Sequence, residues 1–321
     1  MTVPRERGRF APTPSGALHV GSARTAVASA LAAWSVGGDW VLRVEDLDHA
    51  RTAPGATAAM LDDLRWLGLT WDEGPDVGGA YGPYLQSERA GLYEDALRSL
   101  QSKGLAYPCA CSRRDVELAS SAPHGREPVY PGTCRGLDPE EVRAQARARG
   151  LGISWRFRVP DPVFIEVEDR VLGASTHHVA EETGDFVIYR SDGVAAYQLA
   201  VVVDDLAMRI TEVVRGADLL DSTARQVLLY RAFDATPPRW AHLPLVLDGE
   251  GARLAKRSGA MGIAALRASG VSARDLRRWL LASLGIEGDA LREAAKRFDV
   301  ARLPREEVRW TRDAMPRGAR A

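Results

Sequence analysis

Residues 7–103 alternate between short apolar runs and longer segments in which apolar residues recur every three or four positions. The short runs predict buried strands, and the longer segments predict helices. The predicted strands are residues 8–12 and 40–45, and the predicted helices are residues 19–36, 54–67 and 87–103. Strands that alternate with helices are typical of an α/β fold with a parallel sheet, in which ligands bind at the carboxyl ends of the strands.

Residues 105–180 interrupt this pattern with all the cysteines, a loop rich in Ser, Pro and Gly, and short alternating runs at 153–159 and 163–167. We interpret them as an insertion that splits the sheet in sequence. Strand and helix patterns then resume at 185–190, 195–206, 211–215, 221–233 and 243–247, and helices alone are predicted at 261–268, 272–284 and 289–298. The expected organisation is a first half of the sheet domain at 1–104, the insertion at 105–180, the second half at 181–258 and a short helical region at 259–321.

The chain has 321 residues, of which 45% are hydrophobic, as in an ordinary globular protein. Its first residues lack an apolar stretch, and its longest apolar run, near 194–203, is too short to cross a bilayer. We therefore expect a cytoplasmic protein without a membrane segment. The net charge of −1 is uneven, because residues 251–321 hold 16 Lys and Arg against 8 Asp and Glu and leave −9 for residues 1–250. Such a basic end predicts contact with a polyanion, although arginines on solvated helix faces produce the same count.

The segment RFAPTPSGALHVGS, residues 9–22, joins the first predicted strand to the following helix. Two prolines end the strand, and Gly16 and Gly21 allow the backbone to approach a ligand closely. The free N–H groups that open the helix favour an anion, and His19 in the first turn can donate to a phosphate. The segment predicts a phosphate site, and a capped helix after a turn is the alternative interpretation.

A second segment, residues 245–260, has the pattern of a strand, a Gly-rich turn and a basic loop before a helix. Lysine occurs only at Lys103, Lys256 and Lys296, whereas Lys and Arg together number 42. A lysine in a chain that otherwise uses arginine indicates a need for a compact, mobile ammonium. Such an ammonium stabilises the charge that develops on a transferring phosphoryl group, so we expect a catalytic role for Lys256. Chance retention on a solvated loop is the alternative.

All three cysteines, Cys109, Cys111 and Cys134, lie between residues 109 and 134. Three thiols cannot pair completely, and closely spaced thiolates on a loop suit zinc, which takes four tetrahedral ligands. Side-chain chemistry favours His124 as the fourth ligand, since imidazole is a common zinc ligand and a phenol is not. Tyr130 is the competing candidate, and unrelated thiols are the alternative to a metal site. A metal at this position is expected to be structural, because nothing connects it with the phosphate motifs.

Charged residues at the ends of predicted strands indicate a pocket for a small zwitterion with an extra acid. Strand alternation places Arg43 and Glu45 on the same face. Glu45 can bind an ammonium, and Arg9 and Arg215 can bind carboxylates through bidentate pairs, with Tyr197 closing the pocket. Each of these residues alone is more often part of a surface ion pair, so the charges by themselves do not name the ligand.

Together, the two motifs resemble the HIGH and KMSKS signatures of class I aminoacyl-tRNA synthetases. His19-Val20-Gly21-Ser22 stands in the place of the first signature, and residues 253–257, RLAKR, stand in the place of the second. The segments 9–24, 43–48 and 254–260 look like the glutamyl branch of these enzymes. The resemblance implies the class I synthetase fold, which is a Rossmann-type parallel sheet split by a zinc-containing insertion and followed by a small helical C-terminal region.

Only 65 residues follow Lys256, whereas glutamyl-tRNA synthetases continue with a long anticodon-binding region. This length and the Cys-x-Cys then Tyr-x-x-x-Cys pattern resemble the glutamyl-queuosine tRNA(Asp) synthetases, short paralogues of the glutamyl enzymes. Zinc ligands of that family match Cys109, Cys111, Tyr130 and Cys134, so the resemblance favours Tyr130 over His124. The glutamate contacts match Arg9, Phe10, Ala11, Pro12, Thr13, Glu45, Tyr197 and Arg215, and the ATP contacts match His19, Gly21 and Lys256.

The resemblance implies that the chain activates L-glutamate with ATP without needing tRNA, and then transfers the glutamyl group to queuosine at the wobble position of tRNA(Asp). His19 and Lys256 would be catalytic, Mg²⁺ would accompany ATP, and one zinc would be structural. The expected partners are glutamate, ATP and the queuosine-bearing anticodon arm of tRNA(Asp), with no membrane, and the expected state is a monomer.

Two positions depart from the signatures, because Ala255 replaces the usual serine of the second and Ser22 replaces the final histidine of the first. We expect activity, and a reduced rate is consistent with these changes. Three other functions compete with this interpretation. They are a glutamyl-tRNA synthetase that charges tRNA(Glu) or tRNA(Gln), an inactive paralogue that binds RNA through its basic end, and a nucleotidyltransferase that acts on a small acid.

Overall fold

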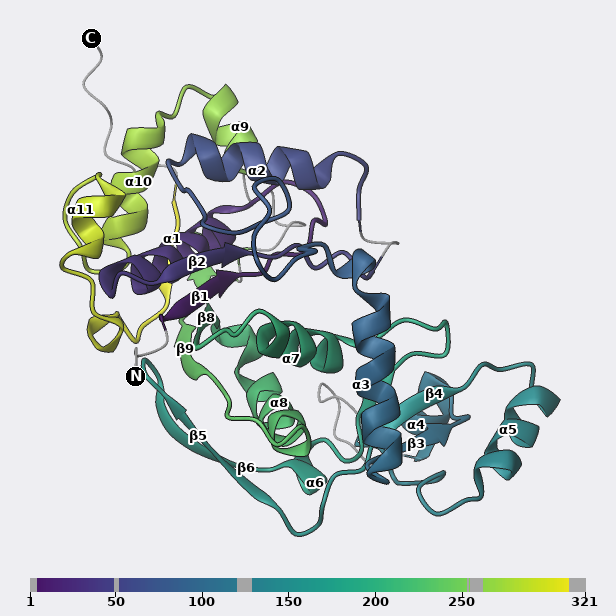
Figure 1. The fold of residues 1–321 in the computed structure, drawn as a ribbon. Helices are drawn as coiled ribbons and strands as arrows, with labels where there is room; N and C mark the ends of the chain where they lie inside the picture. Colours follow the sequence, from purple (N-terminus) through teal and green to yellow (C-terminus); the bar gives the residue numbers. More distant parts are fainter. Residues whose placement is uncertain (1–4, 49–51, 120–128, 253, 255–261, 312–321) are drawn as a thin grey trace.

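A six-stranded sheet forms the centre of the computed structural model, which describes residues 5–48, 52–119, 129–252, 254 and 262–311. The strand order is β2-β1-β8-β9-β5-β6, and all neighbours are parallel except the β5–β6 hairpin (Figure 1). The strands are β1 (Arg7–Phe10), β2 (Asp39–Leu42), β5 (Phe164–Asp169), β6 (Gly173–His178), β8 (Glu212–Gly216) and β9 (Arg239–Leu243). The parallel sheet that the sequence predicts is therefore present, with one antiparallel edge strand.

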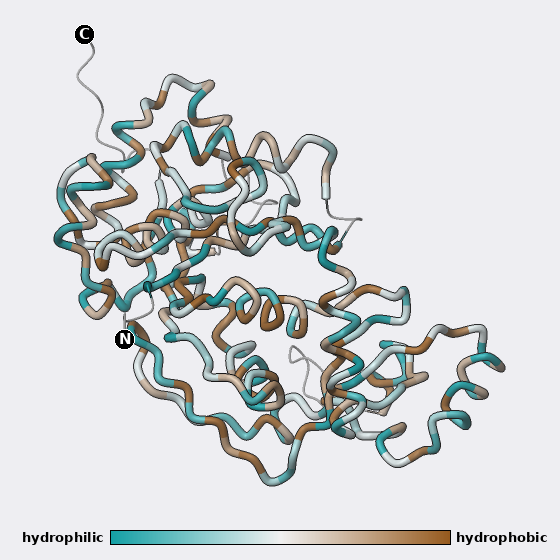
Figure 2. The backbone as a smooth tube through the Cα atoms, in the orientation of Figure 1, coloured by the Kyte–Doolittle hydropathy of each residue, from teal (hydrophilic) through white to brown (hydrophobic). Residues whose placement is uncertain are grey.

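Helices cover both faces of this sheet (Figure 1). Successive strand residues point to opposite faces, so Trp40 and Leu42 of β2 pack into one core while Val41 packs into the other. The first core contains α1 (Val20–Ser35), α2 (Ala56–Trp66), α9 (Ile263–Ala268), α10 (Ala273–Ala282) and α11 (Leu291–Ala295). The second contains α3 (Ala90–Ser102), α7 (Tyr197–Ala207) and α8 (Leu220–Ala232), and α7 is hydrophobic along most of its length (Figure 2).

Helix α1 starts directly beside the carboxyl end of β1 and is buried along most of its length. Its sequence is rich in alanine, which has the highest helix propensity, and small side chains let the helix lie close to the sheet. His19 caps its N-terminus by accepting a hydrogen bond from the backbone N–H of Ser22 at 3.2 Å. Just after its C-terminus, Gly37 has a φ of +65°, a conformation that favours glycine and turns the chain into β2.

A second, three-stranded sheet in the order β3-β4-β7 lies at the end of the molecule farthest from α10 and α11 (Figure 1). Its strands are β3 (Ala106–Cys109), β4 (Ser154–Phe157) and β7 (Val187–Tyr189), and the neighbouring helices are α4 (Arg113–Ala119) and α5 (Pro139–Ala148). Asp138 caps α5, and Pro139 occupies its first turn. The remaining short elements are α6 (Val179–Glu182), β10 (Val246–Leu247), β11 (Val308–Arg309) and the 3₁₀ turns η1 (Gln86–Glu88), η2 (Ala217–Leu219) and η4 (Val300–Arg302).

Two strands pair differently from the prediction, which placed residues 163–167 in the insertion and residues 185–190 in the main sheet. Both assignments were wrong, because β5 joins the main sheet beside β9, and β7 pairs with β4 in the small sheet. The alternating run FIEVED correctly indicates a half-buried strand. Figure 2 shows hydrophilic and hydrophobic residues alternating along the β5–β6 hairpin. The partner of a strand, however, depends on residues far away in the sequence, so the local pattern does not identify it.

Within the described part of the chain, no helix is both long enough and apolar enough to span a membrane.

Asp63 on α2 supplies a prediction about pH and stability. Its side chain is only 4% exposed, and burial, together with the negative charge of Asp62, raises its pKa to about 6 against a weaker opposing effect of Arg267. Above that pH the side chain is ionised in both states, but only the folded state buries the charge. We therefore expect Asp63→Asn to raise the free energy of unfolding by about 1–3 kcal/mol at pH 8 and to lose most of this benefit near pH 4, where the folded side chain is neutral and the unfolded one is only partly ionised.

Urea unfolding of both proteins at pH 8, 6 and 4 checks the expectation. Asp95→Asn is the matched control, because the side chain of Asp95 on α3 is 69% exposed and does not contribute to the pKa of Asp63. A gain from Asp63→Asn that stays constant over this pH range would contradict the proposed cause.

Candidate active site

A cavity of about 360 Å³ opens at the carboxyl ends of β1, β8 and β9. The chain order reverses there, since β1 is followed on one side by β2 and on the other by β8, and parallel α/β sheets bind ligands at such a point. Every described residue that the sequence analysis assigned to glutamate or ATP lines this cavity. These residues are Arg9, Phe10, Ala11, Pro12, Thr13, His19, Gly21, Glu45, Tyr197 and Arg215.

The segment between β1 and α1 forms one wall of the cavity. The carbonyl oxygens of Phe10 and Pro12 accept hydrogen bonds from the backbone N–H groups of Arg43 and Glu45, both at 3.0 Å, so this segment is fixed against the chain that follows β2. The N-terminus of α1 and its cap His19 then face the cavity. Because α1 has 16 residues and its first N–H groups lack partners within the helix, this end attracts an anion.

Gly21, in the first turn of α1, leaves room for the His19 ring. A Cβ atom at this position would lie 3.2 Å from both Cε1 and Nδ1 of His19, closer than ordinary van der Waals contact. A side chain at this position would therefore require the His19 ring to shift by a few tenths of an ångström.

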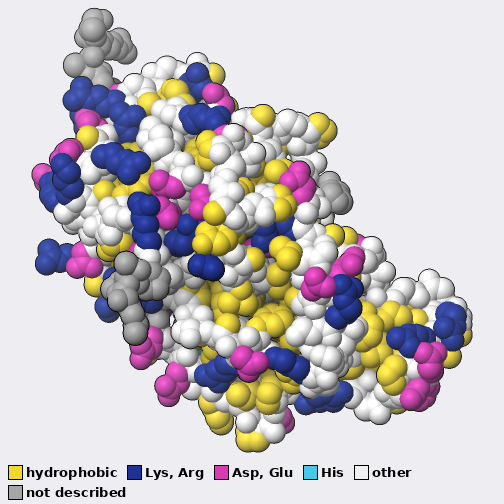
Figure 3. All heavy atoms as spheres, in the orientation of Figure 1, with side chains coloured by type: hydrophobic (Ala, Val, Ile, Leu, Met, Phe, Trp, Pro, Cys, Tyr) yellow, Lys and Arg dark blue, Asp and Glu magenta, His cyan; other side chains and the backbone are white. Residues whose placement is uncertain are grey.

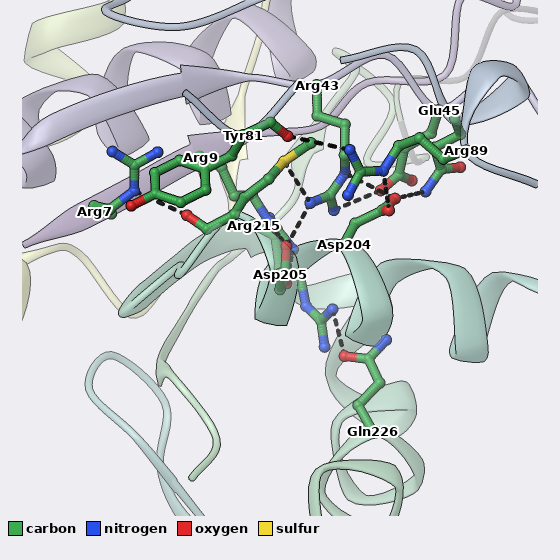
Figure 4. A network of polar contacts seen from close by, with 12 residues as sticks. Arg7, Arg9, Arg43, Glu45, Tyr81, Arg89, Asp204, Asp205, Arg215 and Gln226 are labelled. Carbon is green, nitrogen blue, oxygen red and sulfur yellow. Dashed lines mark hydrogen bonds and ion pairs between the residues drawn. The ribbon is translucent and has the colours of Figure 1, made fainter. Parts of the chain in front are cut away.

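Buried charges connect β1, β2 and α7 next to the cavity (Figure 4). Asp205 accepts from Arg9 at 3.3 Å and from Arg43 at 2.6 Å, and Arg43 also contacts a carboxylate oxygen of Glu45 at 3.1 Å. Burial favours a raised pKa for Asp205, but Arg9 and Arg43 outweigh it and hold the pKa below its usual value. Burial prevails at Glu45 despite the same two arginines, and its pKa is raised. Glu45 is thus an ionisable carboxylate with a pKa shifted upward at the edge of the cavity.

Asp204, the neighbour of Asp205 on α7, joins this network to α3. It accepts from Arg89 Nε at 2.6 Å and from the Tyr93 hydroxyl at 3.0 Å, and it lies 3.5 Å from Arg43 Nε. Gln86 Nε2 donates to it at 2.7 Å. The network therefore pairs three buried arginines with two buried aspartates and the partly buried Glu45. The arginines are Arg9, Arg43 and Arg89, and the aspartates are Asp204 and Asp205.

Arg215 on β8 differs from these arginines. The residue is 3% exposed, and its guanidinium donates four hydrogen bonds to neutral groups, at 2.9 Å to 3.2 Å. The acceptors are His242 Nε2, Gln226 Oε1, Thr223 Oγ1 and the carbonyl oxygen of Leu219. The guanidinium also lies over the Trp240 ring, 4.8 Å from its centroid, which is a favourable cation–π contact. No carboxylate of a described residue lies within ion-pair distance of it, and burial lowers its pKa.

Tyr197 is the first residue of α7 and lines the cavity with 36% of its surface exposed. Tyr197 therefore lies at the mouth of the cavity, and Arg215 lies next to it on the wall.

Sequence reasoning missed several residues of this region, namely Asp204, Asp205, His242 and Arg24. Two adjacent aspartates inside the apolar helix sequence YQLAVVVDDLA were the available signal, since buried carboxylates need partners. Arg24 lines the cavity and donates to the carbonyl oxygens of Pro244 at 2.7 Å and Ser283 at 3.1 Å. Burial lowers its pKa to about 10. This arginine ties the wall of the cavity to the end of α10.

Lys256, the predicted catalytic lysine, lies outside the described residues, as does His124. Two described residues that flank Lys256 in the sequence lie at or next to the cavity. Leu254 lines it, and Gly262 forms an antiparallel bridge with His19.

The three cysteines form a second, separate cluster beside the small sheet. Their sulfur atoms all lie within 4.8 Å of one another, and Cys111 and Cys134 are 3.7 Å apart. The Tyr130 hydroxyl lies 3.4 Å from the sulfur of Cys109 and 3.9 Å from that of Cys111. Burial favours a raised pKa for Cys109, but its hydrogen bond with Tyr130 and the nearby Arg156 guanidinium outweigh it and lower the pKa.

This geometry fits a tetrahedral zinc ion. Zinc–sulfur bonds of about 2.3 Å separate two sulfur ligands by about 3.8 Å, close to the distance between Cys111 and Cys134. The Tyr130 oxygen lies beside the same sulfurs, so the described residues offer three thiolates and one phenol oxygen. Cys109, Cys111, Cys134 and Tyr130 are the residues that would hold the ion.

Removal of one thiol tests this metal site. We expect the purified wild-type protein to contain one zinc per chain and Cys134→Ser to lose it, with a melting temperature lower by about 5–15 °C, because metal binding contributes folding free energy. Elemental analysis and thermal unfolding measure both effects. His124→Gln is the matched control and should keep its zinc. A wild-type chain that contains no zinc after expression with added zinc would contradict the site, and zinc loss in His124→Gln would make His124 the fourth ligand.

A family model described as tRNA synthetases class I (E and Q), catalytic domain, matches residues 6–315 of the chain. The chain is 53% identical over 309 residues to the Glutamyl-Q tRNA(Asp) synthetase of Symbiobacterium thermophilum, a match that covers 94% of this chain and 95% of that protein. It is 44% identical over 320 residues to Glutamate–tRNA ligase 1 of Halorhodospira halophila, where it covers 98% of this chain and 66% of the relative.

Among solved structures, the chain resembles the glutamate-tRNA synthetase of Elizabethkingia anophelis, with a TM-score of 0.85 and 29% identity. The match covers 96% of this chain and 68% of that one. A glutamate tRNA ligase from Elizabethkingia meningosepticum, solved in complex with its amino acid, gives a TM-score of 0.84 at 28% identity, with the same coverage.

Proposed function

Because the chain belongs to the class I tRNA synthetases of the glutamate and glutamine (E and Q) family, we propose that it activates L-glutamate with ATP, without needing tRNA, and transfers the glutamyl group to queuosine of tRNA(Asp). The reaction would proceed through glutamyl-adenylate, with pyrophosphate as the leaving group. The acceptor would be the cyclopentenediol of queuosine at the wobble position.

The uncompensated charge of Arg215 is the observation that carries this proposal. Arg9, Arg43 and Arg89 are balanced by three carboxylates, whereas Arg215 and Arg24 contact only neutral groups among the described residues. The three guanidinium nitrogens of Arg24 already donate to Pro244 and Ser283, so Arg215 is the cation left for a ligand carboxylate. A buried charge is costly without a partner, and the open side of Arg215 is the cavity. L-Glutamate carries one ammonium and two carboxylates at neutral pH, and its net charge of about −1 would offset the charge of Arg215.

We place the side-chain carboxylate of glutamate against Arg215 and Arg9, and its ammonium against Glu45. These three groups line the same cavity, and Phe10, Ala11, Pro12, Thr13 and Tyr197 complete its walls. Arginine suits a carboxylate because its planar fork can donate two parallel hydrogen bonds. The α-carboxylate of the substrate is then free to attack the α-phosphate of ATP.

ATP is assigned to the same cavity beside the N-terminus of α1. His19, the first N–H groups of the helix and the backbone at Gly21 would face its phosphates, and Lys256 would stabilise the charge that develops as pyrophosphate leaves. Mg²⁺ would accompany ATP and neutralise the phosphate oxygens. The zinc site lies in the small sheet and would serve as a structural support for it.

Two relatives favour queuosine of tRNA(Asp) over the 3′ end of tRNA(Glu) as the acceptor. The chain is 53% identical to one protein named Glutamyl-Q tRNA(Asp) synthetase and 46% identical to another, from Nitratidesulfovibrio vulgaris, and it covers 95% and 90% of their lengths. Lys and Arg side chains gather over α10 and α11 on the face shown in Figure 3, which offers a surface for an RNA backbone. Charging of tRNA(Glu) is the second candidate, because the relative from Halorhodospira halophila is named a glutamate–tRNA ligase.

Pyrophosphate exchange tests the first half of the proposal. The purified chain should incorporate labelled pyrophosphate into ATP when L-glutamate is present and no tRNA has been added. Absence of exchange with glutamate, under conditions in which the chain is folded, would contradict glutamate activation and would favour an inactive RNA-binding paralogue. Exchange that appears only after tRNA is added would contradict the tRNA-independent step.

Glu45→Gln tests the assigned ammonium contact. We expect the KM for glutamate in the exchange reaction to rise by about 30–100-fold while kcat changes little, because a charge-assisted hydrogen bond is replaced by a neutral one. Since burial raises the pKa of Glu45, the wild-type KM should also rise as the pH falls toward that pKa, and the variant should lack this dependence. An unaltered KM in Glu45→Gln would remove Glu45 from the ammonium site.

A further inference from the structure

His242 and Asp169 lie directly behind Arg215, on the side away from the cavity. Arg215 and His242 are paired residues on the neighbouring strands β8 and β9, and Arg215 Nε donates to His242 Nε2 at 2.9 Å. The other ring nitrogen, Nδ1 of His242, lies 2.6 Å from Asp169 Oδ2. Both His242 and the carboxylate of Asp169 are fully buried. The three residues thus form a chain that ends at the cavity.

The hydrogen bonds of Asp169 determine which nitrogen of His242 carries the proton. The carboxylate of Asp169 accepts from the backbone N–H groups of Val171 at 2.9 Å, Leu172 at 2.8 Å and His242 at 3.0 Å. A carboxylate with three such donors is ionised and cannot donate a hydrogen bond itself. The proton of the histidine therefore lies on Nδ1, and Nε2 is left as an acceptor.

This arrangement requires a neutral imidazole. A proton on Nε2 would point at the N–H of Arg215, and two donors cannot satisfy each other. Burial and the neighbouring Arg215 lower the pKa of His242 against the opposing effect of Asp169, which agrees with a neutral ring. The negative charge of Asp169 consequently reaches Arg215 only across the imidazole ring.

Two other acceptors of Arg215 are also held in place. Gln226 Oε1 accepts from Arg215 Nη1 at 2.9 Å (Figure 4), while Gln226 Nε2 donates to Gln198 Oε1 at 3.0 Å. Gln198 in turn donates to the Ser222 hydroxyl at 3.0 Å. The amide of Gln226 is therefore oriented with its oxygen toward the guanidinium, and this acceptor is neutral as well.

We propose that His242, oriented by Asp169, is a positioning residue that fixes Arg215 with a neutral acceptor, so that the charge of Arg215 selects a ligand carboxylate over an amide. Gln226 contributes in the same way from α8. The inference rests on the proposed function, because it assigns the side-chain carboxylate of glutamate to Arg215. Its physical basis is that a carboxylate in place of either neutral acceptor would form a buried ion pair with Arg215 and remove the advantage of glutamate over glutamine.

Isosteric pairs of variants separate charge from shape at these positions. In His242→Gln the side-chain oxygen can take the place of Nε2 as a neutral acceptor, whereas His242→Glu places a carboxylate there. Gln226→Glu makes the same change of charge at the second acceptor. It is the test variant if His242→Glu fails to fold. His177→Gln, on the edge strand β6, is the matched control for loss of an imidazole.

The experiment measures KM and kcat for glutamate, KM for ATP and the exchange supported by glutamine, with thermal unfolding as a check on folding. We expect His242→Gln to stay within about threefold of the wild-type KM for glutamate, as His177→Gln should. His242→Glu and Gln226→Glu should raise that KM by about 30-fold or more, reduce the preference for glutamate over glutamine by about tenfold, and leave the KM for ATP unchanged.

The inference is overturned if folded Gln226→Glu or folded His242→Glu prefers glutamate over glutamine as strongly as the wild type does. An equal loss of glutamate affinity in His242→Gln and His242→Glu would also overturn it, because shape alone would then explain the effect. These results are distinct from failure of the proposed function, in which the wild-type chain itself would show no glutamate-dependent exchange and the inference would fall with it.

Discussion

Arg215→Gln is expected to raise the KM for glutamate in pyrophosphate exchange by about 10²–10³-fold, with the KM for ATP within about threefold of wild type. Unlike Arg9, Arg43 and Arg89, the buried guanidinium of Arg215 has no carboxylate partner among the described residues, and its free side faces the cavity. Glutamine at this position keeps hydrogen-bonding groups but removes the charge that is assigned to the substrate carboxylate. Loss of one partner of a buried ion pair costs about 3–5 kcal/mol, and the lower part of this range corresponds to the expected loss of affinity.

Two further variants make this prediction specific. Arg215→Lys keeps the charge without the planar fork, so it should recover part of the lost affinity. Arg190→Gln is the matched control, because Arg190 is 43% exposed and pairs with Asp192 on the surface. A wild-type KM for glutamate in folded Arg215→Gln would remove Arg215 from the binding site and would leave the charge of the cavity unexplained by glutamate.

Lys256→Ala is expected to lower kcat for pyrophosphate exchange by about 10²–10³-fold and to change the KM for glutamate little. An ammonium that contacts the phosphates mainly in the transition state stabilises the departing pyrophosphate, so its loss appears in the rate rather than in substrate binding. The chain is well suited to this test, since it contains only three lysines. Lys296→Ala is the matched control, because Lys296 is 69% exposed and pairs with Glu293.

The same measurement can contradict the assignment. An unchanged rate of adenylate formation in Lys256→Ala would show that the second motif supplies no catalytic ammonium. Equal losses in Lys256→Ala and Lys296→Ala would point to a general effect on the protein instead.

The residues on the cavity wall could be foreseen because they come from contiguous motifs at the ends of strands. Strand ends such as Arg9–Phe10 and Arg215–Gly216 have a local signature, and parallel strands bring their carboxyl ends to one edge. Ten residues that the sequence assigned to two ligands therefore line one cavity in the structure. Their individual roles remain proposals that the variants above test.

The supporting residues could not be foreseen, because their function depends on pairing between distant parts of the chain. Asp205 bridges Arg9 and Arg43 from α7, and Asp169 reaches His242 from β5, a strand that its sequence position suggested belonged to the insertion. A buried aspartate in a helix indicates that a partner exists but not which residue it is. For the same reason, the sequence correctly predicted β5 and β7 as strands but not the strands with which they pair.

The cysteine cluster combines both situations. The spacing of Cys109 and Cys111 predicts a metal site locally, but the fourth position depends on how residues 129–134 fold back onto the small sheet. The structure places the Tyr130 hydroxyl beside the thiols, which chemistry alone did not favour.

Transfer of labelled glutamate to tRNA tests the central claim most directly. The purified chain, with ATP and Mg²⁺, would be incubated with tRNA(Asp) that carries queuosine, tRNA(Asp) that lacks it, and tRNA(Glu). We predict label only on the queuosine-containing tRNA(Asp). Label on tRNA(Glu), or on tRNA(Asp) without queuosine, would contradict the account and would make the protein an enzyme that charges the 3′ end of a tRNA.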